Sequence, residues 1–261
     1  MTPEKGAGRM PRPFFYARHD VLDSTNDEAR RLIDTGRGKD MLVIHALRQT
    51  SGRGRRGRTW LSPPGNLTFS VLIDTSPKPF GAASLGLVAA IALADAVDDV
   101  VGEARARCKW PNDVMVDGRK LAGMLLEAAD NGRWLIMGIG VNVANRPSDD
   151  QVETPAVCLS ELGYAGDIER VLETFCHHFG PKIALWRSQG FASFQAQWVE
   201  RAYGLDQEIR VRLPDRTLIG RFAGLDGDGT LLLTDAQSGE VRRILAGDVF
   251  VGEGGRHASS H

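Results

Sequence analysis

One 20-residue segment, residues 82–101, constrains the fold more than any other part of the chain. It is rich in Ala, Leu and Val, and apolar residues cover all its sides until Asp95. A helix with this pattern has to be buried in a core. Short apolar and β-branched segments, typical of strands, lie before and after it, and they supply the cover. They are residues 14–22, 41–47, 67–73, 105–110, 113–116, 121–128 and 134–143.

The pattern changes toward the C-terminus. Residues 168–187 and 192–201 are predicted to be helices with interleaved aromatic side chains. After residue 205, short strands recur about every 8–12 residues between Gly and Asp turns, which indicates a small β-barrel. The sequence therefore predicts a flexible N-terminus (1–13), a larger domain (14–203), a C-terminal barrel (204–252) and a flexible tail (253–261).

Composition excludes several classes of protein. The 261 residues are 42% hydrophobic and 25% charged, and 32 basic against 33 acidic side chains give a net charge of −1. This balance rules out a disordered or fibrous chain and argues against a generic polyanion binder. The sequence shows no export signal and no apolar stretch long enough to span a membrane. Three scattered cysteines without a C-x-x-C pair predict neither a disulfide nor a zinc site, and they fit a reducing cytoplasm.

The most informative segment is a loop of arginine and glycine, residues 52–58, which reads Gly-Arg-Gly-Arg-Arg-Gly-Arg. Glycines let a backbone approach a ligand closely. Guanidinium groups bind phosphate and carboxylate oxygens through paired hydrogen bonds. Arginines at this density repel one another, so we expect the loop to stay mobile until an anion neutralises it.

Several functions compete for this loop. Its Gly52-x-Gly54-x-x-Gly57 spacing matches a dinucleotide-binding fingerprint, but Pro63 and Pro64 follow, and they prevent the helix that this motif requires. The loop also fits an RNA-binding basic patch or a loop that closes over a nucleotide phosphate. A solvated run of charge is the remaining alternative, and the interleaved glycines and the preceding apolar strand count against it.

A second polar string, Lys-Trp-Pro-Asn-Asp at residues 109–113, joins two predicted strands. Pro111 cannot donate a hydrogen bond to a sheet ladder, so the chain must break or bulge there. The break would present Lys109, Asn112 and Asp113 at a strand end, where functional residues often lie. The string is therefore a candidate part of a site.

Three smaller features accompany these two segments. Lys120 begins a Lys-Leu-Ala-Gly segment and adds a second cation. Gly138 and Gly140 lie inside a predicted strand that leads to Asn142, which indicates close approach of a ligand or of another backbone. Upstream, the start of a helix is predicted by two overlapping capping boxes, Ser24-x-x-Asp27 and Thr25-x-x-Glu28.

Taken in chain order, these segments resemble those of the biotin–protein ligases, also called biotin–[acetyl-CoA-carboxylase] ligases or holocarboxylase synthetases. The resemblance covers about residues 14–252. It implies an α+β fold in which a mixed β-sheet with packed helices forms the catalytic domain, followed by a small SH3-like β-barrel. The segments that carry it are Ser24-Thr25-Asn26, Gln49, the loop 52–58 followed by Trp60, and residues 109–113, 120–123 and 138–142.

The resemblance also implies an ATP-dependent activity in two steps. Biotin and MgATP give biotinyl-5′-AMP and pyrophosphate. A specific lysine on the biotin carboxyl carrier protein domain of acetyl-CoA carboxylase, or of a related carboxylase, then attacks the mixed anhydride. Biotin is the substrate, and ATP and Mg²⁺ are the implied cofactors. No Ser–His or Cys–His nucleophile pair is required, and no set of metal-ligating residues is predicted.

Matching the motifs residue by residue assigns roles to individual side chains. Lys109, Arg55 and Lys120 would be catalytic, because cations between a carboxylate and a phosphate stabilise the charge that develops on the transferring group. The nucleotide would contact Arg55, Trp60, Asn112, Lys120 and Asn142. Biotin would contact Ser24, Thr25, Asn26, Gln49, Arg53, Gly54, Arg55 and Lys109.

Expectations on partners and location, and two alternative functions, complete the sequence-based prediction. Family members that repress transcription carry an N-terminal helix-turn-helix domain, and only about a dozen residues precede the first predicted strand, so we expect no DNA binding. We expect no membrane partner and a cytoplasmic location, and a homodimer is compatible with the sequence. The nearest alternative is a lipoate or octanoate ligase on the same fold. An RNA-binding protein is less favoured, because Trp60 is the one aromatic residue close to the arginines.

Overall fold

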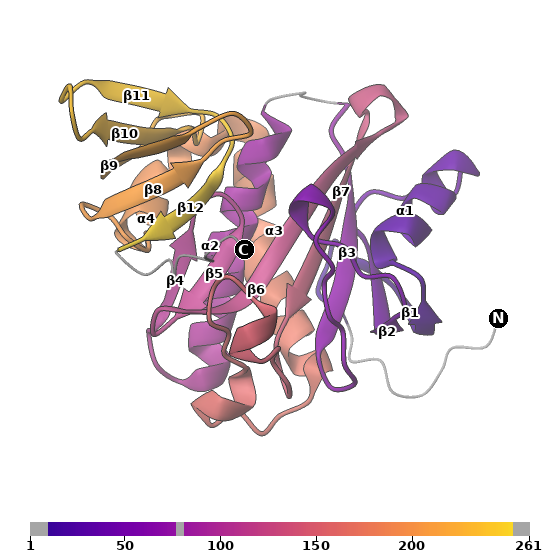
Figure 1. The fold of residues 1–261 in the computed structure, drawn as a ribbon. Helices are drawn as coiled ribbons and strands as arrows, with labels where there is room; N and C mark the ends of the chain where they lie inside the picture. Colours follow the sequence, from indigo (N-terminus) through magenta and orange to yellow (C-terminus); the bar gives the residue numbers. More distant parts are fainter. Residues whose placement is uncertain (1–9, 77–80, 253–261) are drawn as a thin grey trace.

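Two β-sheets organise the protein (Figure 1). The structure, a computed structural model, describes residues 10–76 and 81–252. Most of the predicted N-terminal segment and all of the predicted tail therefore lie outside the described residues. The larger sheet has seven strands and precedes a C-terminal sheet of five.

The seven-stranded sheet is mixed, as expected. Its strand order is β1-β2-β3-β7-β6-β5-β4. Strands β1 and β2 run parallel, and all other neighbours in this sheet run antiparallel. The strands are β1 (Phe15–Leu22), β2 (Leu42–Gln49), β3 (Leu67–Asp74), β4 (Ala106–Lys109), β5 (Asp113–Val116), β6 (Arg119–Ala129) and β7 (Trp134–Val141).

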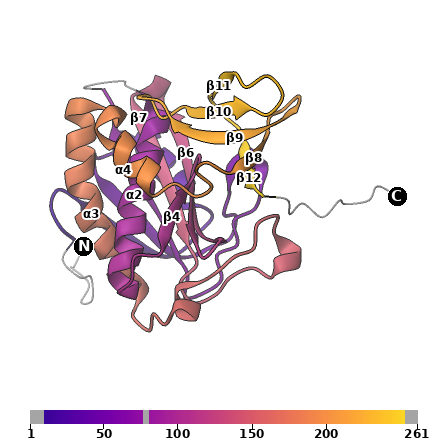
Figure 2. The ribbon, with the colours of Figure 1, turned by 90° about the vertical axis from the view of Figure 1, so that its left-hand side faces the viewer.

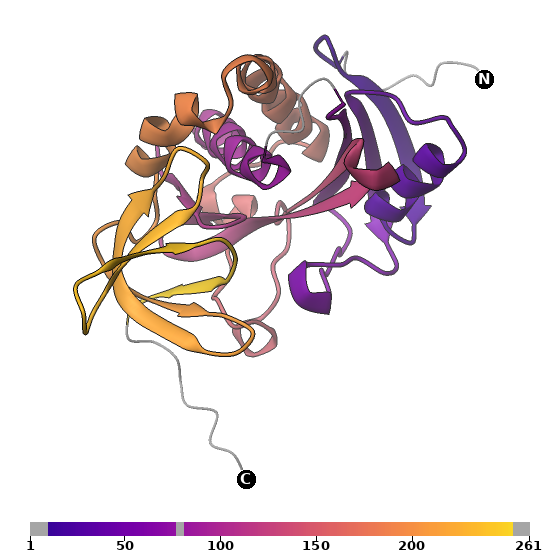
Figure 3. The same cartoon turned by 90° about the horizontal axis from the view of Figure 1, so that it is seen from above.

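Helices cover the two faces of this sheet unequally (Figure 3). Helices α2 (Ala82–Val101) and α3 (Ile168–Gln189) pack side by side on one face, and α1 (Thr25–Asp34) lies on the other. Residues of α2 are buried along most of its length, as its apolar sequence predicts, and they share the main core with aromatic side chains of α3. Because α1 is short, much of its face of the sheet is left for loops.

The C-terminal unit is an antiparallel sheet in the order β11-β10-β9-β8-β12. It lies beside α4 and the β4 edge of the larger sheet (Figure 2). The outermost strands, β11 and β12, are not hydrogen-bonded neighbours, so the described ladder is open, and a closed SH3-like barrel stays a prediction. The strands are β8 (Glu208–Arg212), β9 (Thr217–Leu225), β10 (Leu231–Asp235), β11 (Val241–Ile244) and β12 (Asp248–Val251).

Two local predictions are wrong in detail. Ser24 precedes α1 in an extended conformation, but its side chain makes no capping hydrogen bond, and the hydroxyl of Thr25 donates to Gln49 instead. The predicted helix at 192–201 is shorter: a 3-10 turn, η5 (Phe191–Phe194), leads into α4 (Gln195–Glu200). Within the described residues, none of the helices is long and apolar enough to cross a lipid bilayer.

Candidate active site

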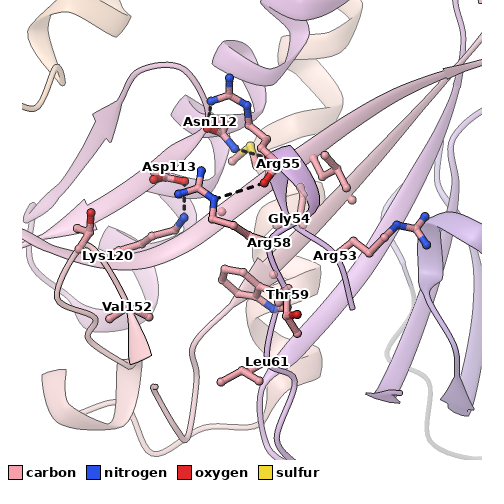
Figure 4. Close-up of a pocket in the computed structure, with 18 of the residues that line it drawn as sticks. Arg53, Gly54, Arg55, Arg58, Thr59, Leu61, Asn112, Asp113, Lys120 and Val152 are labelled. Atoms are coloured by element: carbon pink, nitrogen blue, oxygen red, sulfur yellow. Dashed lines mark hydrogen bonds and ion pairs between the residues drawn. The ribbon is translucent and has the colours of Figure 1, made fainter. Parts of the chain in front are cut away.

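A cavity of about 440 Å³ opens on the α1 face of the large sheet. Residues of β6 and β7 form its floor, and its walls are the start of α1, the loop 53–61, the turn 110–112, the loop 147–156 and β12 (Figure 4). All the site residues that the sequence predicts line it, so the fold brings them together. They are Ser24, Thr25, Asn26, Gln49, Arg53, Gly54, Arg55, Trp60, Lys109, Asn112, Lys120 and Asn142.

At one end of the cavity, buried polar side chains of α1 form a hydrogen-bond network. The backbone N–H and the hydroxyl of Thr25 both donate to Gln49 Oε1, at 2.8 and 3.1 Å. The Nδ2 of Asn26 donates to Glu127 Oε2 at 2.7 Å. The hydroxyl of Ser70 lies 2.6 Å from Asn26 Oδ1 and 2.7 Å from Thr25 Oγ1. Each side chain is therefore held in one orientation.

Gly138 on β7 makes this arrangement possible. A Cβ at this position would collide with Oδ1 of Asn26. The absence of a side chain lets Asn26 lie against the strand, which is the close approach that the glycines in this segment predict.

Two ammonium groups face the cavity. Lys109 ends β4 and is 7% exposed, and its burial lowers its pKa. No ion pair within the described chain includes Lys109, whereas Lys120 Nζ lies 2.7 Å from Asp113 Oδ1. Because β4 and β5 pair Lys109 with Asp113 across a tight turn, the predicted chain break at Pro111 is confirmed. A desolvated cation of this kind favours the binding of an anion.

The arginines of the loop are already paired with carboxylates of the chain itself. Arg53 forms a two-pronged hydrogen bond with Asp27 of α1 at 2.6 Å, and its guanidinium points away from Lys120 (Figure 4). The other arginines converge on one carboxylate, Asp248 at the start of β12. Its distance is 3.6 Å from Arg55, 3.3 Å from Arg56 and 3.4 Å from Arg58. The arginines are therefore neutralised without a ligand, contrary to the premise of the sequence-based expectation, whereas the mobility of the empty loop stays a prediction.

Asp248 remains ionised despite its burial. Desolvation acts to raise its pKa, but Arg212 and the loop arginines outweigh it, and the pKa lies below its ordinary value. Arg55 also donates through Nη1 to Asn112 Oδ1 and to the carbonyl of Gly247, at 3.2 Å each, and burial lowers its pKa. The loop is thereby joined to the Lys-Trp-Pro-Asn-Asp turn and to the C-terminal sheet.

Trp60 and Asn142 have different surroundings. The indole of Trp60 lies so close to Gly140 that a Cβ there would collide with the ring, and its Nε1 is buried without a hydrogen-bond partner among the described residues. The Nδ2 of Asn142 donates to the carbonyls of Val157 and Lys120, at 3.2 and 3.4 Å. Asn142 lines the cavity, but its amide nitrogen is engaged by these two backbone carbonyls. Its contact with a nucleotide therefore stays a prediction.

The sequence-based prediction missed the acidic and hydroxyl partners of the site. Two of them could have been noticed in the sequence, because Ser70 and Glu127 are polar residues inside largely apolar strand segments. Asp27 was assigned only to a helix cap. Glu153 and Asp248 belong to no local motif, because their significance comes from contacts with residues far away in the chain.

Known proteins are similar to this chain in sequence and in fold. Residues 19–143 match the model of the biotin/lipoate A/B protein ligase family, and residues 204–252 match the biotin protein ligase C-terminal domain. A biotin–[acetyl-CoA-carboxylase] ligase of Paracoccus denitrificans is 38% identical over 88% of this chain and 98% of its own length. The bifunctional ligase/repressor BirA of Bacillus subtilis is 32% identical over 90% of this chain and 73% of its length.

A solved structure agrees with these relatives. The biotin protein ligase of Aquifex aeolicus, in complex with biotin and ATP, superposes with a TM-score of 0.79 at 26% identity, and covers 91% of this chain and 98% of its own. The chain belongs to the biotin protein ligase family.

The contact between Trp60 and Gly140 gives a first prediction. In Gly140→Ala the new methyl group displaces the indole from β7, so we expect the loop 53–61 to detach from the sheet. Limited trypsin digestion should then cut after Arg53, Arg55 or Arg58 several-fold faster than in the parent protein. Gly227→Ala is the matched control, because a Cβ there meets no atom within 4 Å. Equal cleavage of both variants would contradict this account of how the loop is anchored.

Proposed function

We propose that the protein is an ATP-dependent biotin–[acetyl-CoA-carboxylase] ligase. The observation that carries the proposal is the division of one cavity into two chemically different ends. Buried amide and hydroxyl groups gather at the first turn of α1, and cations gather around Lys109 and Lys120. Biotin has the same division, with a ureido ring that both donates and accepts hydrogen bonds and a carboxylate at the end of its chain.

The first step joins two anions, the carboxylate of biotin and ATP. The positive charges of the cavity reduce the electrostatic repulsion between them. A carboxylate oxygen of biotin attacks the α-phosphorus of ATP, the bond to the bridging oxygen breaks, and pyrophosphate leaves. In our proposal Lys109 contacts the carboxylate and the reacting phosphate, while Arg55 and Lys120 contact phosphate oxygens, so that their charges stabilise the transition state. Holding both reactants in one cavity supplies much of the remaining acceleration.

The second step needs no nucleophile from this chain. The unprotonated ε-amine of a carrier lysine attacks the acyl carbon of biotinyl-5′-AMP, the bond to the phosphate oxygen breaks, and AMP leaves as an anion. The amine loses a proton to form the amide. We propose the biotin carboxyl carrier protein domain of acetyl-CoA carboxylase, or of a related carboxylase, as the acceptor.

We further propose that Mg²⁺ enters as part of MgATP. The carboxylates of the cavity are engaged by cations: Asp113 by Lys120, and Asp248 and Glu153 by arginines. Mg²⁺ typically keeps several water ligands and binds through substrate phosphates. Such an ion fits this donor set better than a metal held by protein side chains alone. The described cysteines are unpaired thiols, in keeping with the cytoplasmic location that we propose.

The alternatives fit the site less well. A lipoyl or octanoyl group has no ureido ring to hydrogen-bond with the amide and hydroxyl groups of Thr25, Asn26 and Gln49, so it would gain no polar contact at this end of the cavity. An RNA-binding function needs arginines that are free to meet phosphates along a surface. Here Arg55 is half-buried, and the neighbouring arginines share Asp248.

The direct test is to incubate the purified protein with biotin and MgATP and to look for biotinyl-5′-AMP by mass spectrometry. Pyrophosphate release is measured in parallel, with lipoate and octanoate as competing acids. We expect adenylate formation with biotin in clear preference to the other acids. Preferential use of lipoate or octanoate would reassign the protein to the alternative ligase class.

Lys109 gives a prediction on pH. Its burial lowers its pKa, so the ammonium loses its proton at a lower pH than an ordinary lysine does. If the charged form is required, kcat/KM for adenylation falls as pH rises through that lowered pKa. Lys109→Ala should lose adenylation by about 100-fold or more. Lys109→Arg keeps its charge at high pH and should lose the alkaline decline, at a reduced rate, because a planar fork does not replace a compact ammonium.

Circular dichroism and the thermal midpoint serve as the controls for these variants. An unchanged pH profile in Lys109→Arg, or full activity in Lys109→Ala, excludes the proposed role of Lys109.

Arg55 gives a second prediction. Arg55→Gly removes the hydrogen bonds to Asn112 and to the carbonyl of Gly247 and the ion pair with Asp248. The loop should then close less well over the adenylate, which escapes and acylates exposed lysines. We expect biotin on a bystander protein such as serum albumin, detected by blotting, in the variant but not in the parent protein. Strict carrier specificity in the variant, together with unchanged proteolysis of the loop, would falsify this assignment.

A further inference from the structure

Four charged side chains form a closed ring at the edge of the cavity. Arg58 lies 3.2 Å from Glu153, and Glu153 lies 2.8 Å from Arg212. Arg212 lies 3.1 Å from Asp248, which is 3.4 Å from Arg58. Each member therefore contacts two neighbours of opposite charge. We call these four residues the charge ring.

The charge ring joins three separate parts of the chain that border the cavity. Arg58 belongs to the loop 53–61, Glu153 to the loop 147–156, and Arg212 and Asp248 to strands β8 and β12 of the C-terminal sheet. Arg212 binds Glu153 through both terminal nitrogens, at 3.0 and 2.8 Å, and this hydrogen bonding holds the pKa of Glu153 below its ordinary value. The ring is thus a direct connection between two cavity loops and a second sheet.

Its strength is suited to reversible closure. The side chains of Arg58, Glu153 and Arg212 are 50%, 49% and 41% exposed, whereas that of Asp248 is 7% exposed. Exposed ion pairs contribute little individually and are screened by salt, although two-pronged geometry and networks strengthen them. Contacts of this kind open on the time scale of catalysis more readily than a packed apolar seam.

We propose that the charge ring is a latch that retains the adenylate between the two half-reactions. Arg212 is a positioning residue in this latch, because it acts through Glu153 and Asp248, which line the cavity together with Arg58. The inference rests on the proposed function, since it assigns a residence time to biotinyl-5′-AMP. A mixed anhydride is open to water and to stray amines until the carrier arrives, so a closed cavity protects both the intermediate and the specificity of transfer.

The alternation of charge decides which variant tests the latch. Exchanging Glu153 and Arg212 would place like charges against Arg58 and Asp248, so a charge swap cannot restore the ring. The double variant Glu153→Gln/Arg212→Gln instead removes one charge of each sign. It keeps the net charge and leaves the contact between Arg58 and Asp248 in place.

The matched control is the double variant Asp206→Asn/Arg221→Gln. It removes a 2.6 Å ion pair that belongs to the same C-terminal region and does not line the cavity. Both double variants lose one charge of each sign, so they differ in the position of the lost pair and not in net charge.

The experiment follows release of the intermediate. Enzyme loaded with labelled biotinyl-5′-AMP is mixed with excess unlabelled biotin and MgATP, and labelled adenylate leaving the protein is measured. For Glu153→Gln/Arg212→Gln we expect release to be about three- to tenfold faster, with a smaller change in kcat for adenylation. Each single variant should release the adenylate nearly as fast as the double variant, because each substitution breaks the contact between Glu153 and Arg212. Raising the salt concentration should accelerate release from the parent protein and the control more than from the double variant.

The outcomes separate two failures. If the double variant releases adenylate at the rate of the control, with the same salt dependence, the proposed role of the charge ring is wrong. The proposed ligase activity is not affected by this result. If the parent protein forms no biotinyl-5′-AMP, the proposed function is wrong, and the proposed role of the charge ring is wrong as well.

Discussion

The site must concentrate positive charge in a confined space before any anionic ligand arrives. Two unit charges of the same sign 6 Å apart repel each other by about 3 kcal/mol at an effective dielectric constant of 20. Three loop arginines reach one carboxylate, Asp248, and the fourth reaches Asp27. The internal anions hold the loop while the cavity is empty. A bound phosphate would then share or replace Asp248 as their partner.

The fold makes room for this arrangement by separating packing from chemistry. Because α2 is apolar on nearly all sides, it must be covered by the sheet and by α3, which commits one face of the sheet to the core. The opposite face carries the short helix α1, and its remaining area is covered by loops and by the C-terminal sheet. Gly138 and Gly140 leave this face of β7 without side chains, so that Asn26 and Trp60 lie directly on the strand.

Much of this could be predicted from the sequence, and the exceptions share a physical cause. The ends of α2 agree with the apolar pattern, and all the predicted site residues line one cavity, because residues of the same function lie in short local strings. The capping boxes failed because the hydroxyl of Thr25 has a better partner in Gln49, which is remote in sequence. Asp248 and Glu153 were missed for the same reason, since the pairing of charges across the cavity is a property of the fold.

The two half-reactions require opposite states of this cavity, closed for adenylate formation and open for transfer. The ion pairs of the charge ring at its edge are suited to both states. Adenylate formation favours a closed site, where low polarity strengthens the contact between cations and phosphate and water is excluded. Transfer requires the same site to admit a lysine from another protein. An apolar seam between the loops and the C-terminal sheet would satisfy the first demand and obstruct the second. Three of the four charges in the ring, on Arg58, Glu153 and Arg212, are about half-exposed, so they can separate into water without leaving apolar surface exposed. The attraction that restores closure does not depend on reforming precise packing.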